Sequence, residues 1–127
     1  MTRVLLVGAG GFLGSAARYL LSTFAFSVTP NWRFPLGTFL ENILGCFAVG
    51  LLAGLAEGRG YFSPETRILL VTGLLGGFTT FSAFGLETLV LIKRGNVWIA
   101  ALYIAASVVL GLLGAWGGEL ASVKYGG

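Results

Sequence analysis

Apolar residues fill four long segments of the chain, and short polar stretches separate them. Each segment is close to the ~20 residues that an α-helix needs to span a bilayer. Proline, glycine and charged residues mark the connections between the segments. The pattern predicts an all-α membrane protein in which residues 1–127 form a single domain of four transmembrane helices, with both termini on the same side. The predicted spans are about residues 4–26, 36–56, 68–92 and 97–121.

The middle of the third segment departs from the pattern of an ordinary span. It reads GLLGGFTTFSAFGLE from Gly73 to Glu87, so glycines and hydroxyl side chains stand where leucine, isoleucine and valine would suffice. Glycine loosens a helix, and threonine and serine hydroxyls bond backbone groups that a break frees. We therefore expect the third helix to be broken near Gly76–Thr80, at mid-membrane. Lipid does not tolerate such a break unless protein buries it or it lines a water-filled cavity, which indicates a conduction or transport protein.

Composition excludes several classes of function. Only 10% of the residues are charged, against about 25% in soluble domains. The chain has no histidine and one cysteine, Cys46, which argues against disulfide frameworks, zinc sites and Cys–His nucleophile pairs within one chain. The longest basic run is Lys93–Arg94, which is too short for a phosphate-binding footprint. We expect neither enzyme activity nor a nucleic-acid partner.

Basic residues divide almost evenly between the two predicted sides of the membrane. The N-terminus, the second connection and the C-terminus share one side, and the first and third connections share the other. Near equality means almost no positive-inside bias, which favours dual topology and an antiparallel homodimer. The alternative is a single orientation that one basic residue or the timing of insertion fixes. The counted residues are Arg3, Arg59, Arg67 and Lys124 on the first side, and Arg33, Lys93 and Arg94 on the second.

An antiparallel dimer would have its two-fold axis at the midplane of the membrane. The predicted break lies near the middle of its span, so the breaks of two copies would meet on that axis. Carbonyl groups released by both breaks would then face each other. Clustered carbonyls at membrane depth favour a small cation.

The start of the chain imitates a dinucleotide-binding turn. Gly8, Gly11 and Gly14 follow one another at spacing three. That motif requires a strand–turn–helix unit and an acidic residue about 20 positions later. The first acidic residue is Glu41, and no alternation of strands and helices follows. We therefore interpret Gly10 and Gly14 as a G-x-x-x-G face that packs closely against another helix.

Three charged side chains lie well inside the predicted spans, where such groups are costly and are functional candidates by default. They are Arg18, Glu41 and Glu87, all in the half of the membrane nearer the first and third connections. Arg18 either forms a structural ion pair with one of the glutamates or draws anions into a vestibule. The sequence leaves both interpretations open.

Polar and aromatic side chains of three spans are candidates for an anion path. Asn42 offers amide donors at depth, although a structural hydrogen bond between helices would also explain it. Phe81 and Phe84 follow the break, and the positive edge of an aromatic ring can hold a small bare anion. Tyr103 and Ser107 are four residues apart on one face of the last span.

Taken together, these motifs resemble the Fluc (CrcB-like) fluoride channel family. The likeness covers essentially the whole chain. It rests on an arginine in the first span, G-T-x-x-x-N in the second (Gly37, Thr38, Asn42) and GGFTTFSAF in the third, followed by Glu87. The third motif is the most specific of these.

The resemblance implies a passive, fluoride-selective ion channel in the bacterial inner membrane. Such a channel exports fluoride from the cytoplasm and gives fluoride resistance. It is an antiparallel dual-topology homodimer with two pores. The resemblance also implies a structural sodium ion on the dimer axis, held by the backbone carbonyls of Gly76 and Thr79. The implied fluoride-pore residues are Asn42, Phe81, Phe84, Tyr103, Ser107, Thr38 and Arg18.

Two other functions remain as alternatives. A proton-coupled exporter of the small multidrug type is also a dual-topology dimer of four-span chains. That class relies on a glutamate in the first span, where this chain has Arg18 and no acid. A non-transporting assembly subunit is the third possibility. Proton-independent fluoride flux through the purified protein would separate a channel from both.

Overall fold

The computed structural model describes residues 1–59 and 62–126, without the side chains of 58, 59 and 124–126. Two basic residues of the charge count, Arg59 and Lys124, therefore lie outside the described side chains. Within these ranges the chain is helical and contains no strand. Four helical segments are long and apolar enough to cross a membrane, and each predicted span falls inside one of them. They are Thr2–Val28, Leu36–Glu57, Pro64–Lys93 and Val97–Val123.

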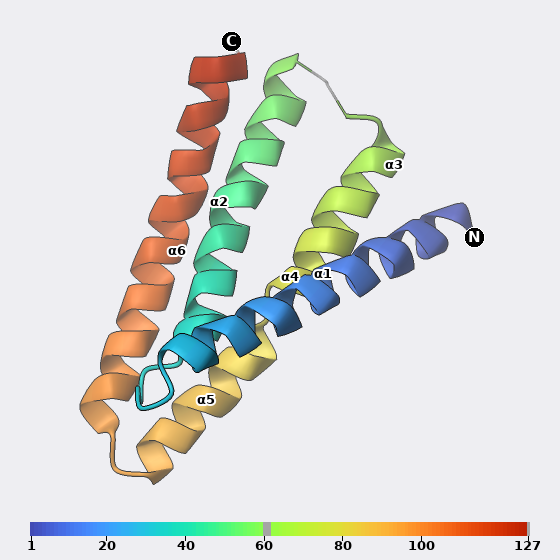
Figure 1. Ribbon diagram of the computed structural model, residues 1–127. Helices are drawn as coiled ribbons and strands as arrows, with labels where there is room; N and C mark the ends of the chain where they lie inside the picture. The colour runs from blue at the N-terminus through green and yellow to red at the C-terminus, as the bar shows by residue number, and fades with distance from the viewer. Residues whose placement is uncertain (60–61, 127) are drawn as a thin grey trace.

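Three of the four segments are continuous helices, and the third is divided. Helices α2 and α6 run side by side, whereas α1 crosses the third segment near α4 (Figure 1). The first and third connections meet at the end opposite the C-terminus (Figure 1), where Arg33 Nη1 donates to Asn96 Oδ1 at 3.0 Å. The elements in chain order are α1 (Thr2–Val28), α2 (Leu36–Arg59), α3 (Pro64–Arg67), the π-helix η1 (Ile68–Leu75), α4 (Gly76–Phe78), α5 (Phe81–Lys93) and α6 (Val97–Gly126).

Glycines bring α1 into backbone contact with the third segment. A Cβ atom on Gly14 would lie 2.0 Å from the Leu74 carbonyl oxygen, and one on Gly10 would lie 2.5 Å from the Leu69 carbonyl oxygen. Only glycine fits at such a distance, which confirms the interpretation of G-x-x-x-G as a packing face. Helix α1 is continuous through these glycines, so the resemblance to a nucleotide-binding turn has no structural counterpart.

Helices α2 and α6 approach each other by the same means. A Cβ atom on Gly50 would lie 2.0 Å from the Ala115 carbonyl oxygen, and one on Gly118 would lie 2.1 Å from the Phe47 carbonyl oxygen. Close contact of backbones replaces the hydrophobic driving force that lipid cannot supply between helices. The fold thus consists of two closely packed helix pairs, α2 with α6 and α1 with the third segment.

We expect Gly14→Ala to lower the free energy of unfolding by about 1–3 kcal/mol, because the added methyl group forces α1 away from Leu74. Gly8→Ala is the matched control, since a Cβ atom on Gly8 meets nothing within 4 Å. Thermal unfolding of both variants in detergent tests the difference. Equal melting temperatures for the two variants would contradict the close packing of α1.

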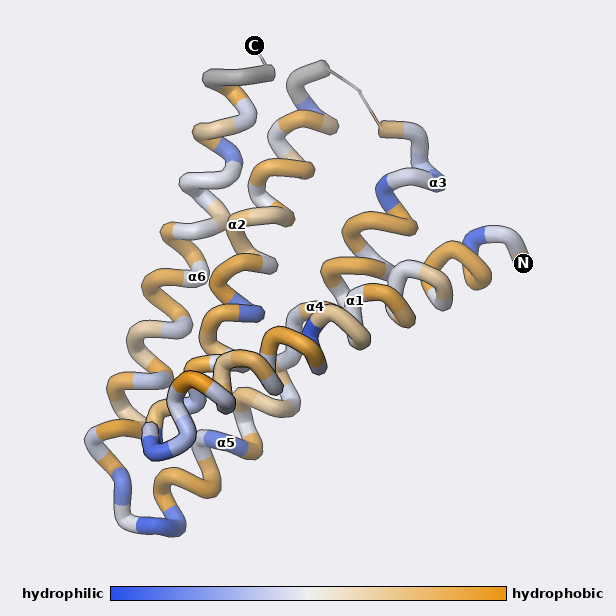
Figure 2. Tube along the Cα trace, viewed as in Figure 1, coloured by the Kyte–Doolittle hydropathy of each residue, from blue (hydrophilic) through white to orange (hydrophobic). Residues whose placement is uncertain are grey.

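Few side chains are buried within the chain itself, and large apolar side chains are exposed along all the spans. Apolar residues dominate the helices in Figure 2, and hydrophilic residues gather at the connection between α5 and α6. A soluble monomer rarely exposes so much contiguous apolar surface, so the structure is that of a multi-pass membrane protein. The buried apolar cluster consists of Leu91, Ala100 and Tyr103, with Phe34, Phe39, Phe84 and Ile99 packed against it.

Candidate functional site

The third segment is interrupted at Thr79 and Thr80. Their backbone angles are φ −88° and ψ 155° at Thr79, and φ −153° and ψ 119° at Thr80, which are extended rather than helical values. Helix α5 begins at Phe81, and the Thr80 hydroxyl caps it by accepting a hydrogen bond from Ala83 N at 3.1 Å. The break lies close to the middle of Pro64–Lys93, so the prediction of a broken third helix is confirmed.

The helix that leads to the break is wider than an α-helix. Element η1 is a π-helix of 8 residues with the sequence ILLVTGLL. π-Helical turns are rare and are often found at functional sites. The apolar sequence carries no signal for this geometry, so the π-helix was not predicted.

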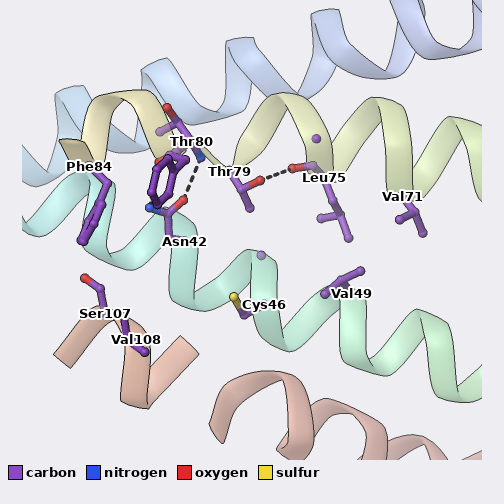
Figure 3. Close-up of a pocket in the computed structure, with 13 residues that line it drawn as sticks. Asn42, Cys46, Val49, Val71, Leu75, Thr79, Thr80, Phe84, Ser107 and Val108 are labelled. Atoms are coloured by element: carbon purple, nitrogen blue, oxygen red, sulfur yellow. Dashed lines mark hydrogen bonds between the residues drawn. The ribbon is translucent and has the colours of Figure 1, made fainter. Parts of the chain in front are cut away.

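Asn42 of α2 binds the break with both ends of its side-chain amide. Its Nδ2 donates to the Thr80 carbonyl oxygen at 3.1 Å, and its Oδ1 accepts from Thr80 N at 2.8 Å. Figure 3 shows this side chain extending from α2 to the break. The structural hydrogen bond between helices, one of the two interpretations of Asn42, is therefore present. The same side chain also lines the groove described below.

Because of these hydrogen bonds, two carbonyl groups near the break lose the N–H donors that a continuous α-helix would provide. In a continuous α-helix the Gly76 carbonyl would accept from Thr80 N, and the Thr79 carbonyl would accept from Ala83 N. Thr80 N donates instead to Asn42 Oδ1, and Ala83 N donates to Thr80 Oγ1. The two carbonyls that the family resemblance assigns to a cation are thus released from helical pairing.

Arg18 reaches the break from α1. Its Nε donates to the Gly77 carbonyl oxygen at 3.1 Å. In the described part of the chain the only ion pair joins Arg3 to Glu65, at 4.0 Å. The ion pair between Arg18 and a glutamate, one of the two interpretations left open by the sequence, is therefore not formed.

A groove of about 400 Å³ runs beside the break, with walls from α2, the third segment and α6. It brings together Asn42, Phe81, Phe84 and Ser107, four of the residues assigned to the pore. The rings of Phe81 and Phe84 have centroids 5.7 Å apart. Figure 3 shows Phe84 and Ser107 at one end of the groove, near Asn42. The Ser107 hydroxyl oxygen is buried and has no hydrogen-bond partner among the described residues.

Thr38 and Tyr103, two further residues assigned to the pore, do not line this groove. Both donate to Glu87, Thr38 Oγ1 to Oε1 at 2.7 Å and the Tyr103 hydroxyl to Oε2 at 3.0 Å. Thr38 and Glu87 also line a second cavity of about 230 Å³ near the first connection. On its other side the Tyr103 ring packs against the Phe84 ring, with centroids 5.0 Å apart. Thr38, Glu87 and Tyr103 form a polar cluster, and this cluster lies between the second cavity and the groove.

Comparison with known proteins identifies the family. The family model described as CrcB-like protein, Camphor Resistance (CrcB), matches residues 5–119. The chain belongs to the CrcB-like family. Relatives named fluoride-specific ion channel FluC include proteins from Methylobacillus flagellatus (58% identical, 91% of each chain covered), Chlorobaculum tepidum (48%, 94% of each) and Chlorobium luteolum (45%, covering 96% of this chain and 93% of the relative). The resemblance to the Fluc (CrcB-like) family is thereby confirmed, and the family is one of transporters rather than enzymes.

From the sequence, two acidic residues of this CrcB-like chain were candidates only for an ion pair with Arg18. Glu87 proves to be the acceptor at the centre of the polar cluster. Glu41 is 1% exposed and accepts a hydrogen bond from the Ser22 hydroxyl of α1. Their position inside apolar spans was the signal, but a sequence does not show which hydroxyl groups face a carboxylate.

Proposed function

We propose that this protein is a passive channel that conducts fluoride selectively. The observation that carries the proposal is the groove beside the break, which gathers two phenylalanine rings, a buried hydroxyl and an amide in a chain whose relatives are named fluoride-specific ion channels. The polar cluster around Glu87 continues from this groove to the second cavity. These groups together form a route through the half of the membrane nearer the first connection.

Selectivity for a small anion follows from the groups that line the groove. Its lining residues within the described chain include no charged side chain. Ring edges, hydroxyl groups and the positive N-terminal end of α5 can replace part of the hydration shell of fluoride. Each contact is weaker than a bond to a fixed cation, so the ion both enters and leaves, as conduction requires. The larger chloride ion would fit these closely spaced groups less well.

We propose further that two copies form an antiparallel dual-topology homodimer with two pores. The nearly even division of basic residues supports insertion in both orientations. Phe81 is 83% exposed in the single chain although it lines the groove, so a second copy would complete the wall that the first leaves open.

A structural sodium ion at the dimer axis fits the released carbonyls. Gly76 and Thr79 would each contribute a carbonyl oxygen from both copies, and hard cations prefer oxygen ligands. The ion would supply positive charge that holds the two breaks together. The relatives compared above come from bacteria, which supports a location in the bacterial inner membrane and export of fluoride from the cytoplasm.

A proton-coupled exporter of the small multidrug type is not favoured. The only charged side chain well inside the first span is Arg18, which donates to the Gly77 carbonyl. The family comparison also points to channels.

Efflux from proteoliposomes tests the proposed function. Vesicles loaded with potassium fluoride are diluted into fluoride-free buffer, valinomycin is added, and a fluoride electrode records release. We expect rapid electrogenic fluoride efflux without a proton gradient and little flux from vesicles loaded with potassium chloride. Efflux that strictly requires a proton gradient, or equal flux of chloride, would contradict the proposal.

A further inference from the structure

Arg18 is a charged side chain at membrane depth whose observed partner is a carbonyl group of the break. We propose that Arg18 is a positioning residue for the cation site: by holding the Gly77 carbonyl, it keeps that group away from the cation and fixes the break at which the Gly76 and Thr79 carbonyls would face the cation. This inference rests on the proposed function, because it assumes a cation at the dimer axis.

The carbonyl groups of Gly76, Gly77 and Thr79 differ in what has become of the N–H donor that a continuous helix would give them. The helical donor of Gly76 is diverted to Asn42, and that of Thr79 is diverted to the Thr80 hydroxyl. The helical donor of the Gly77 carbonyl would be the N–H group of Phe81, which lies beyond the extended residues and starts α5. Arg18 Nε takes the place of this donor at 3.1 Å. Without it, the Gly77 carbonyl would be a further unpaired acceptor close to the two proposed ligands.

Packing of α1 fixes Arg18 relative to the break. Arg18 follows Gly14 by four residues and Gly10 by eight, so the three residues share one face of α1. A Cβ atom on Gly77 would lie 2.6 Å from the Gly11 carbonyl oxygen, so α1 and α4 touch backbone to backbone. The donor is Nε, the guanidinium nitrogen nearest the main chain, as this short distance between the helices requires.

The charge of Arg18 acts in the opposite direction to its hydrogen bond. A guanidinium group is always protonated in a protein, and it repels a nearby cation. If charge were its main effect, removal of Arg18 would strengthen sodium binding. If positioning is its main effect, removal of the donor weakens sodium binding. The sign of the change therefore distinguishes the two.

Two neutral substitutions separate the hydrogen bond from the charge. In Arg18→Gln, the side-chain nitrogen stands at the same depth as Nε and still donates. In Arg18→Met, the chain has the same length and no donor. Arg3→Met is a control for the loss of an arginine from the same helix, because Arg3 is exposed and far from the break.

The experiment is a sodium titration of the full-length protein, purified in detergent with N-methylglucamine in place of sodium. Thermal unfolding is measured at each sodium concentration, which gives a midpoint for stabilisation that does not depend on flux. We expect Arg18→Met to raise this midpoint about tenfold, as for the loss of a charge-assisted hydrogen bond. We expect Arg18→Gln and Arg3→Met to stay within about twofold of the wild type.

Equal midpoints for Arg18→Met and the wild type, or a lower one, would overturn the inference. If Arg18→Met does not fold, Arg18→Leu replaces it as the variant without a donor. A tenfold rise in the midpoint of Arg18→Gln would also overturn the inference. A wild-type protein that conducts fluoride without any response to sodium defeats this inference and leaves the channel standing. If the wild-type protein responds to sodium but conducts no fluoride, the proposed channel function is wrong. The titration of the Arg18 variants then still decides the role of Arg18.

Discussion

We expect Phe81→Ile to reduce fluoride flux about 100-fold, which corresponds to roughly 3 kcal/mol in the barrier to conduction. The Phe81 ring lines the groove beside Phe84 and Asn42. Isoleucine has comparable bulk but no ring, so the positive edge that would contact a bare anion is lost. The substitution should leave the fold of each chain intact, because the side chain is 83% exposed. Fluoride efflux from proteoliposomes measures the flux, and thermal unfolding measures the stability.

Phe12→Ile is the matched control for this prediction. Phe12 is 74% exposed on α1, and it lies outside the groove. We expect it to retain the flux of the wild type, since the same chemical change occurs away from the proposed path. Full flux in Phe81→Ile, or an equal loss in Phe12→Ile, would remove the phenylalanine ring from the proposed mechanism.

We expect Asn42→Ala to lower the free energy of unfolding by about 2–4 kcal/mol, because the N–H and C=O groups of Thr80 both lose their partner at membrane depth. The break should also close toward helical pairing, since Thr80 N then becomes available to the Gly76 carbonyl. We therefore expect fluoride flux to be abolished together with the response to sodium. Chemical unfolding in detergent gives the free energy, and the efflux assay gives the flux.

Asn96→Ala provides the comparison for Asn42→Ala. In the described part of the chain, the Asn96 side chain accepts one hydrogen bond, from Arg33, at an exposed connection between helices. Its loss should cost less than about 1 kcal/mol, because water replaces the missing partner. Similar losses for the two variants would show that the bonds of Asn42 to the break contribute little beyond an ordinary surface contact.

The sequence by itself determined the features that depend on neighbouring residues. Length and apolarity of a segment decide whether it spans a bilayer, and all four spans were predicted within helices that the structure contains. The Gly-Gly-Phe-Thr-Thr run placed the break correctly, because glycine and hydroxyl residues weaken a helix wherever they occur. The spacing of Gly10 and Gly14 likewise identified a packing face, although not the helix that it meets.

Only the tertiary structure decided which groups face one another. Arg18 and Gly77 are 59 residues apart, and Asn42 and Thr80 are 38 apart. The period of a helix shows which face a residue occupies, but several helices can present a carbonyl or a carboxylate to that face. In the structure, Arg18 therefore bonds to a carbonyl of the break and not to a glutamate. Thr38 and Tyr103 donate to Glu87 and do not line the groove. Partner choice depends on how the helices cross, and no local pattern in this chain records that geometry.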